Sequence, residues 1–471
     1  MDTSSPPWPP RPRAPVFAAA LGLLAGCSPA LGRGTGAVPD DGRVAPLVRL
    51  APTDRSGAVF AHGLSVGPSG DRTLLLAGWG ALDLGDTQAA LFSTALAVVT
   101  PSGVVAAPIA LGCDPKEPSK LFPRPGGAVV VVCAELRGVE PDLRTTPLLR
   151  YALAPAERAP TRTRLVVPLA RVEAVTVTAD GSLVAAGFAE GERHGKAVVR
   201  LDAEGQLAVE GWVPDVPFAG TELAALPDGD VVVASVTEGG PSRNGLHVLR
   251  LAGADLAPRW DRSLRGVGAL ELADSTPKLA AAPEDGLVYL GATLGRPGVS
   301  QFAPGLFALE LDTGRVRWEQ AFDGPGESSL DAVAARPGGG LVAVLGLDPG
   351  QGRRARFEVG DTSYTNRGAY DHDLVVAWLE ADGRATRSER LAMNADRSTA
   401  SVYAHLAFEP DGRLVIAGNF YRALRGAGRA IEGPAEVVCR DEAPPSAGPA
   451  GEAEPACHTL ASSAVFVATY E

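Results

Sequence analysis

The stretch that decides the fold is Ala407-Phe408-Glu409-Pro410-Asp411-Gly412-Arg413-Leu414-Val415-Ile416-Ala417-Gly418. An Asp-Gly pair here precedes an apolar run that ends in glycine. This pattern predicts a β-hairpin, because a tight turn needs residues that tolerate a positive φ. The same signature, a turn followed by an apolar run, recurs along the chain with turn glycines at Gly70, Gly126, Gly181, Gly229, Gly286, Gly339 and Gly412.

The turn glycines are 48 to 73 residues apart, and a second strand–turn–strand signature follows each of the first ones. Examples are Val198–Gly205 and Phe307–Gly314. Each unit therefore reads as four short strands without an amphipathic helix between them. Four-stranded units repeated at this period are typical of a β-propeller. The sequence predicts an all-β fold, a single seven-bladed β-propeller over residues 43–471.

The two ends of this region predict how the ring closes. The chain ends on Ala464–Tyr470, which is a third strand with no fourth strand after it. Residues 43–50 form a lone strand-like segment before the first repeat, and Pro46 suits an outermost strand because it cannot donate a ladder hydrogen bond. We therefore expect a propeller that is closed by an N-terminal strand lying beside residues 465–470.

Two insertions interrupt the period, at about residues 350–371 and 422–462. Long loops of this kind in a compact domain are either functional or disordered. Trp212, Trp260 and Trp318 recur with the repeat, and we interpret them as packing residues.

The N-terminus predicts the compartment. An apolar run from Ala14 to Gly26 is too short to span a membrane but suits a secretory signal. It ends in Leu24-Ala25-Gly26-Cys27, which resembles the lipobox of bacterial lipoproteins. The resemblance implies a signal peptide over residues 1–26, lipidation at Cys27 and a flexible tether over 27–42. The protein is then an outer-membrane lipoprotein of the cell envelope, periplasmic or surface-exposed, with the membrane as a partner. An ordinary cleaved signal or a buried apolar strand is the alternative.

Four cysteines remain after Cys27, an even number for an oxidising compartment. Of the three possible pairings, the simplest joins Cys113 to Cys133 and Cys439 to Cys457. Buried free thiols are the alternative.

The stretch at residues 407–418, together with Tyr370–Leu379 and Asp382-Gly383, resembles the delta-60 and related seven-bladed-propeller repeats of bacterial surface proteins. The resemblance implies the fold and a surface or periplasmic setting, but no catalytic residues. Asp312–Trp318 is similar to the tryptophan docking motif of quinoprotein-type repeats. This motif is well formed only once, so we expect no quinone and no other cofactor.

Composition and motifs exclude several functions. A net charge of −12 with 43 basic residues argues against nucleic-acid binding. The chain has no G-x-S-x-G, H-E-x-x-H or P-loop motif, and its six histidines are scattered one at a time. The only dense cluster is Asp371-His372-Asp373, and strand alternation would place its histidine and carboxylates on opposite faces. We expect no metal site and no catalytic residue.

The resulting hypothesis is a monomeric, lipid-anchored propeller that binds a protein or glycan partner without being an enzyme. The alternative is an envelope enzyme with its active site in the central channel. Several His, Asp or Glu side chains converging from the inner strands would favour the enzyme, and an aliphatic channel would favour binding.

Overall fold

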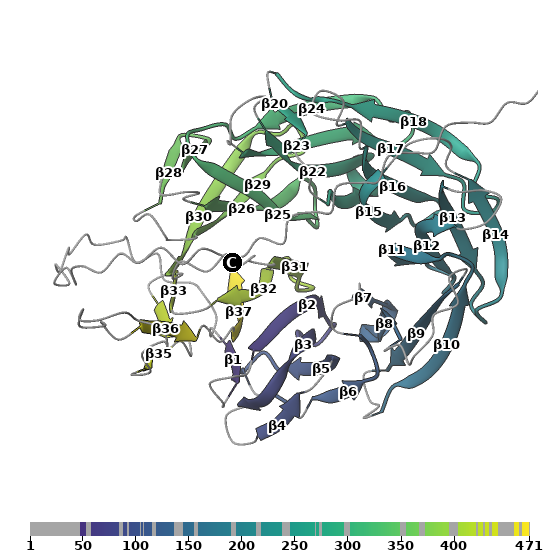
Figure 1. Ribbon diagram of the computed structural model, residues 1–471. Helices are drawn as coiled ribbons and strands as arrows, with labels where there is room; N and C mark the ends of the chain where they lie inside the picture. The colour runs from purple at the N-terminus through teal and green to yellow at the C-terminus, as the bar shows by residue number, and fades with distance from the viewer. Residues whose placement is uncertain are drawn as a thin grey trace, which may run out of the picture. The chain divides into compact units, whose positions relative to one another are not determined.

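The computed structural model describes most residues from Val48 to Tyr470. Residues 1–47 lie outside the description, as do several internal stretches, of which the longest are 53–57, 136–144, 190–194, 213–217, 238–244, 296–301, 349–354, 367–372, 395–403 and 441–455. All the described strands belong to one unit, Asp41–Glu471. They form a β-propeller of antiparallel sheets, whose strands are labelled in Figure 1. No helix within the described part of the chain is long and apolar enough to cross a membrane.

Three sheets have four strands each, in chain order. The first contains β7 (Ser119–Pro123), β8 (Val129–Ala134), β9 (Thr146–Leu153) and β10 (Thr161–Val167). The second contains β11 (Arg171–Val177), β12 (Leu183–Ala189), β13 (Gly195–Leu201) and β14 (Leu207–Trp212). The third contains β15 (Phe218–Ala225), β16 (Val231–Thr237), β17 (Gly245–Leu251) and β18 (Pro258–Leu264).

Two sheets are larger. The nine-stranded sheet contains β1 (Val48–Pro52), β2 (Ala58–Val66), β3 (Arg72–Asp83), β4 (Gln88–Leu91), β5 (Thr94–Val99), β6 (Ile109–Leu111), β31 (Ala404–Phe408), β32 (Leu414–Phe420) and β37 (Ala464–Tyr470). The twelve-stranded sheet contains β19 (Gly266–Val267), β20 (Leu270–Leu272), β21 (Lys278–Ala282), β22 (Leu287–Gly295), β23 (Phe302–Glu310), β24 (Val316–Ala321), β25 (Glu327–Ala335), β26 (Leu341–Asp348), β29 (Asp373–Leu379), β30 (Ala385–Asn394), β33 (Ala423–Gly426) and β34 (Arg429–Glu432). Two short 3-10 helices, η1 (Pro125–Gly127) and η2 (Pro283–Asp285), form turns.

The prediction of a β-propeller is confirmed, but the predicted number of seven blades is wrong. Counted as continuous hydrogen-bonded sheets, the described strands form five blades and two small hairpins. The reason is hydrogen bonding between neighbouring repeats. β1 pairs with β3 as well as with β37, and Phe302 of β23 pairs in parallel with Glu327 of β25. Counting turns in the sequence detects hairpins, but it does not detect pairing that joins one repeat to the next.

An N-terminal strand lies beside the C-terminal one, as expected. β1 pairs antiparallel with β37 through Val48↔Val467, Arg49↔Phe466 and Leu50↔Val465. Leu50 is fully buried in the core between the two ends of the chain. The remainder of the predicted segment, residues 43–47, lies outside the described residues.

The Asp-Gly turns are held by their own side chains. The glycines of three such turns have positive φ, namely Gly181 (90°), Gly229 (89°) and Gly412 (88°). The aspartate before each glycine accepts a hydrogen bond from the backbone two residues further on, at 3.0 Å in the case of Asp180 and Ser182. Glycine supplies the turn conformation, and aspartate supplies the acceptor that closes it.

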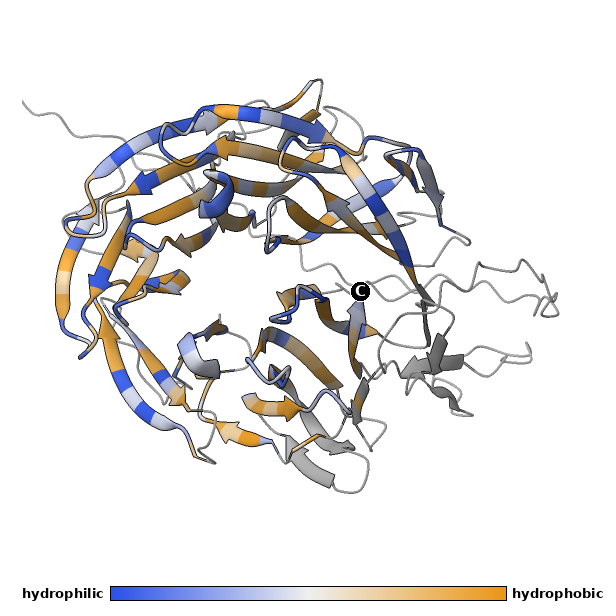
Figure 2. Cartoon of the chain, turned by 180° about the vertical axis from the view of Figure 1, so that it is seen from behind, coloured by the Kyte–Doolittle hydropathy of each residue, from blue (hydrophilic) through white to orange (hydrophobic). Residues whose placement is uncertain are grey.

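The core lies between the sheets. Middle strands such as β17, β29 and β32 are buried along their whole length, because a neighbouring sheet covers each of their faces. Outer strands such as β10 and β18 alternate between exposed and buried residues. Figure 2 shows this as mostly orange middle strands and outer strands with blue segments.

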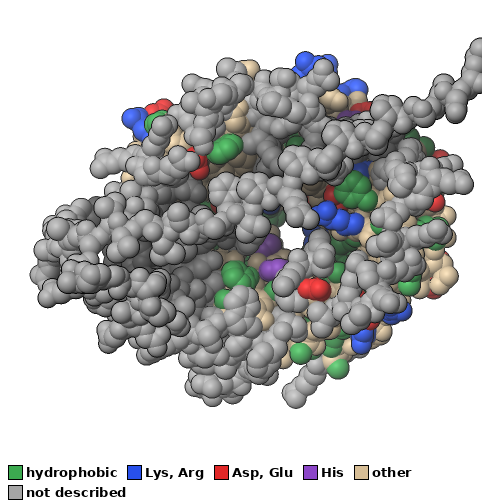
Figure 3. Space-filling view, in the orientation of Figure 1, with side chains coloured by type: hydrophobic (Ala, Val, Ile, Leu, Met, Phe, Trp, Pro, Cys, Tyr) green, Lys and Arg blue, Asp and Glu red, His purple; other side chains and the backbone are tan. Residues whose placement is uncertain are grey.

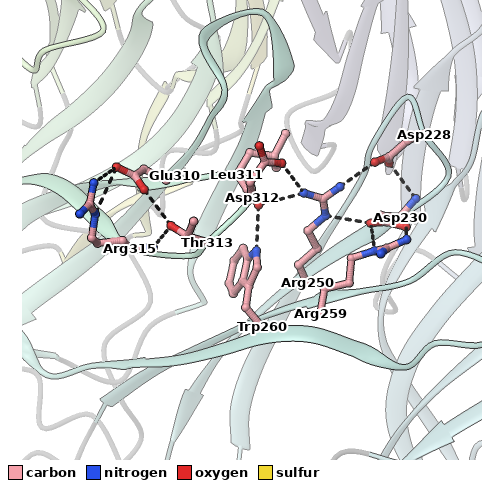
Figure 4. A network of polar contacts seen from close by, with 10 residues as sticks. All are labelled: Asp228, Asp230, Arg250, Arg259, Trp260, Glu310, Leu311, Asp312, Thr313 and Arg315. Carbon is pink, nitrogen blue, oxygen red and sulfur yellow. Dashed lines mark hydrogen bonds and ion pairs between the residues drawn. The ribbon is translucent and has the colours of Figure 1, made fainter.

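Polar contacts join successive repeats. The indole Nε1 of Trp260 donates to the carbonyl oxygen of Leu311 at 2.8 Å, and Trp318 donates in the same way to Ala381. This confirms the packing role for both residues, and the side chain of Trp212 lies outside the described residues. Beside Trp260, Arg250 donates to Asp230 and also to Leu311, so one guanidinium links two repeats (Figure 4).

Part of the first insertion is an ordered hairpin of β27 (Arg356–Val359) and β28 (Thr362–Thr365). Its Phe357 and Tyr364 are buried, and the Phe357 ring centroid lies 6.1 Å from that of Tyr364 and 6.4 Å from that of Phe322. The second insertion contributes a hairpin of β35 (Glu436–Arg440) and β36 (Ala456–Leu460). Residues 356–365 of the first insertion therefore belong to the core and do not form a free loop.

Candidate functional site

Seven inner strands surround the centre of the propeller. Each contacts the next, and the last contacts the first, in the order β2, β7, β11, β15, β21, β25 and β31. Their side chains therefore decide what a ligand entering the centre would meet.

Irregularities in the pairing of these strands change the direction in which single side chains point. The pairing register skips one residue in β2, β11 and β25, at His62, Glu173 and Asp331 respectively. β15 has the same irregularity at Gly220. A β-bulge re-aims the side chain of the extra residue, and bulges are frequent next to active sites.

Each inner strand carries a titratable side chain, and together we call them the channel ring. All of its members are partly buried. They are His62, Lys120, Glu173, Glu222, Lys278, Asp331 and His405. In Figure 3, histidine and positively charged side chains lie around a central opening.

An ion pair shows that side chains of the channel ring lie on the inner side of the strands. Lys120 on β7 pairs with Glu222 on β15, although β11 lies between these two strands. A contact that bypasses the intervening strand has to pass inside the ring. Lys120 and Glu222 are therefore in the channel, with 28% and 22% of their side chains exposed.

His405 is held in one neutral form. Its Nε2 lies 3.1 Å from the carbonyl oxygen of Ala61. Since a carbonyl can only accept, Nε2 carries the proton and Nδ1 keeps a lone pair. The pKa of His405 is lowered to about 4, mainly through desolvation by the surrounding protein and with smaller contributions from the nearby His62, Lys278 and Lys120. The imidazole is therefore uncharged at neutral pH.

His62 is the second imidazole of the ring. Its Nδ1 shares a hydrogen bond of 3.2 Å with the hydroxyl of Ser119, which is buried on the neighbouring strand β7. Desolvation by burial lowers the pKa of His62 as well, so it too favours the neutral form.

A buried network supports the acidic side of the ring. Lys196 on β13 is buried and pairs with Glu173. Thr221 donates to Glu173 at 2.9 Å, and Lys196 lies 4.9 Å from the centroid of the Phe188 ring. These contacts fix the carboxylate of Glu173 and compensate its charge.

The channel ring was missed in the sequence, where the histidines were considered one at a time. A signal was present. His62, Glu173, Lys278 and Asp331 each lie eight residues before a turn glycine, so they occupy the same position of the repeat. Aligning the repeats on their turns brings these polar residues into one column within otherwise apolar strands.

The structure brings one predicted cysteine pair together. Cys113 and Cys133 form a disulfide with both residues buried, as expected. Cys439 and Cys457 lie opposite each other in the β35–β36 hairpin, but their side chains lie outside the described residues. Cys27 lies outside them altogether, and so does its predicted lipidation.

Of the Asp371-His372-Asp373 cluster, the structure describes only Asp373. Asp373 is buried and pairs with Arg390, while Asp371 and His372 lie outside the described residues. Within the described part of the chain, no group of three or more His, Cys, Asp or Glu side chains is placed to hold a metal ion.

No protein-family model matches the chain, and no curated protein does. The lipobox and the delta-60 repeats therefore stay resemblances of the sequence.

Solved structures with a similar arrangement do exist. One is an ulvan lyase of a polysaccharide lyase family, bound to a GlcA(1-4)Rha3S saccharide, with 9% identity and a TM-score of 0.45 over 80% of this chain and 93% of that one. Another is the α-L-arabinanase of Penicillium chrysogenum with arabinobiose, with 12% identity and a TM-score of 0.38 over 80% and 94% of the two chains. A third is the β-propeller domain of the Trilobed protease from Pyrococcus furiosus, with 8% identity and a TM-score of 0.40 over 79% and 98%.

The expectation of a non-enzymatic scaffold has to be corrected. Glycan-processing enzymes are among the similar structures. The likeness is one of fold, so a function has to come from this chain's own residues. Those residues place imidazole and carboxylate side chains on the inner strands, which is the arrangement expected of a channel enzyme and not of an aliphatic binding channel.

Proposed function

We propose that this protein is a cell-envelope enzyme that acts on a carbohydrate in the central channel of the propeller. The observation that carries the proposal is the channel ring, in which seven inner strands each contribute a titratable side chain. Ion pairs that only stabilise the fold would not explain why neutral imidazoles lie in the same ring. Titratable groups with perturbed pKa values in a concave site are candidates for acid–base catalysis.

His405 is the proposed proton acceptor. It is neutral, its Nε2 proton is held by the carbonyl of Ala61, and its Nδ1 has a lone pair. A hydrogen bond to one ring nitrogen fixes which nitrogen acts as the base. The same bond fixes the ring in position, which favours a defined geometry of proton transfer.

Lys120 and Glu222 are the proposed substrate-contacting pair. Because their ion pair lies inside the ring of strands, a molecule in the channel can contact both side chains. Lys120 can donate hydrogen bonds, and Glu222 can only accept them when ionised. A sugar hydroxyl can satisfy both groups, since it donates one hydrogen bond and accepts two. This complementarity favours a polyhydroxylated substrate over an apolar one.

Location at the cell envelope stays part of the proposal. It is supported by the apolar run before Cys27 and by the disulfide between Cys113 and Cys133, a bond that persists in oxidising compartments.

The test is turnover of polysaccharides by the full-length protein and one channel variant. A panel of neutral and acidic polysaccharides is followed by new reducing ends and by the ultraviolet absorbance of unsaturated products. His405→Gln keeps an N–H for Ala61 but removes the basic nitrogen, so we expect a loss of activity of about 10²-fold or more.

His247→Gln is the matched control, because His247 is a buried histidine on β17 that pairs with Asp261 on an outer strand. We expect this variant to keep wild-type activity. The proposal is wrong if folded wild-type protein turns over no member of the panel, or if His405→Gln is as active as the wild type.

A further inference from the structure

The side chains whose charges lower the pKa of His405 most are basic. They are His62, Lys278 and Lys120, which lie on three other inner strands. β21, which carries Lys278, is separated from β31 by β25, so Lys278 acts on His405 past the strand that carries Asp331. Two lysine side chains therefore act on His405 from this part of the channel.

The three described lysines differ in how their charges are compensated. Lys120 pairs with Glu222, and Lys196 pairs with Glu173. Lys278 has no ion pair with any residue that the structure describes, and its side chain is only partly buried. An ammonium group without a partner, in a channel that focuses the field, is available to an anion from outside.

The acidic residue on the neighbouring inner strand β25 already has a hydrogen-bond partner. Asp331 lies at the position of β25 that corresponds to Lys278 of β21, and its Oδ1 accepts a hydrogen bond from Ser329 at 2.9 Å. The Nε2 proton of His405 is already donated to Ala61, so its Nδ1 becomes a donor only when the ring is protonated. An anion beside Lys278 would therefore find one cation and, once His405 takes up a proton, a second one.

We propose that the channel binds an anionic group of the substrate, a carboxylate or a sulfate, between Lys278, His62 and His405. The proposal rests on the proposed function for the location of the site and names its substrate class, an acidic carbohydrate. Binding itself needs no turnover, and it can be measured when no reaction occurs.

Binding of the anion is coupled to proton uptake. A negative charge next to His62 and His405 favours their protonated forms and so raises the pKa of both. The titratable groups on the other inner strands around His405 are His62 on β2, Lys120 on β7, Lys278 on β21 and Asp331 on β25, and a carboxylate such as Asp331 favours the protonated imidazole. The pKa of His405 is about 4 in the free protein, so affinity rises as the pH falls towards that value. Above the raised pKa of the complex, affinity does not change with pH.

The test is calorimetric titration of the full-length protein with glucuronate, inorganic sulfate and the neutral methyl glucoside. Titrations in two buffers of different ionisation enthalpy count the protons taken up. We expect glucuronate to bind at least about tenfold more tightly than methyl glucoside, since a charge-assisted hydrogen bond is worth about 1.5–3 kcal/mol. We also expect net proton uptake near pH 5, and none from methyl glucoside.

Lys278→Gln should abolish the preference for glucuronate. Arg315→Gln is the control, because it removes the same charge from an exposed turn where Arg315 pairs with Glu310. Equal binding of glucuronate and methyl glucoside, no binding of either anion, or an unchanged preference in Lys278→Gln overturns the inference. If one of these results is found but polysaccharides are still turned over, the proposed function stands without this inference. If anions bind as expected but no polysaccharide is turned over, the inference stands and the proposed reaction fails.

Discussion

Arg72 donates from Nη2 to Oε1 of Glu409 at 2.7 Å, and 2% of each side chain is exposed. The two residues are 337 positions apart in the sequence, on the first and last repeats. The same nitrogen donates to Thr469 of β37 at 2.8 Å, and Arg413 pairs with the other carboxylate oxygen at 2.6 Å. The junction between the two ends of the chain thus contains a buried ion pair as well as the strand pairing of β1 with β37.

Breaking this pair from one side should destabilise the protein strongly. Arg72→Ala leaves Glu409 buried with Arg413 as its one remaining cation, and removal of one partner of a buried pair costs about 3–5 kcal/mol. We expect a clear drop in the midpoint of urea unfolding, and a smaller drop when both residues are replaced, as in Arg72→Met with Glu409→Leu. Arg315→Ala, on an exposed turn, should leave the midpoint unchanged. A midpoint for Arg72→Ala equal to that of Arg315→Ala would show that the pair does not hold the junction.

Deletion of the short strand β1 should destabilise the protein strongly. Deletion of residues 48–52 removes the partner of β37 and one partner of β3, and it exposes unpaired edges that favour aggregation. We expect loss of cooperative unfolding or aggregation in size-exclusion chromatography. Deletion of five residues within 28–42, the predicted tether, is the control and should change little. If both deletions melt alike, closure does not depend on this strand.

More of the fold than of the candidate site could be predicted from the sequence. Asp-Gly turns and alternating strands are local features, so residues such as Gly181 and Gly412 predicted the propeller correctly. Pairing between repeats, as at Phe302 and Glu327, has no local signature, and the blade count failed for that reason. The channel ring depends on residues of seven different repeats meeting in space. Only the shared position of His62, Glu173, Lys278 and Asp331 within the repeat could have indicated it.

The disulfide between Cys113 and Cys133 should contribute to stability. It closes a loop with a sequence separation of 20 residues, for which chain entropy gives about 3 kcal/mol. The double variant Cys113→Ala, Cys133→Ala should therefore unfold at lower urea, and mass spectrometry of the unreduced wild type should find the linked peptides. Alkylation of both thiols in the wild type without a reductant would contradict the bond.

Stability should depend on pH through His405. Its pKa is lowered from 6.5 to about 4 in the folded protein, so the unfolded chain binds the proton more readily. The neutral imidazole therefore contributes fully to the free energy of unfolding above pH 6.5, and this contribution is lost as the pH falls towards about 4. His405→Gln cannot take up this proton, so the decrease in its urea midpoint over that interval should be smaller than in the wild type. Parallel pH profiles for the two proteins would show that the imidazole is not held neutral.

The membrane anchor is tested at Cys27. In the lipoprotein prediction, acylation of this residue holds the protein on the membrane, since two or more acyl chains bury enough CH₂ groups, at about 0.8 kcal/mol each, for stable attachment. Cys27→Ala should therefore move the protein from the membrane fraction to the soluble fraction. Cys457→Ala, which removes a thiol far from the N-terminus, is the control and should remain in the membrane fraction. An unchanged distribution of Cys27→Ala, together with no acyl mass on the mature N-terminus of the wild type, would exclude lipidation. The proposed location at the cell envelope would then rest on the disulfide and the apolar run alone.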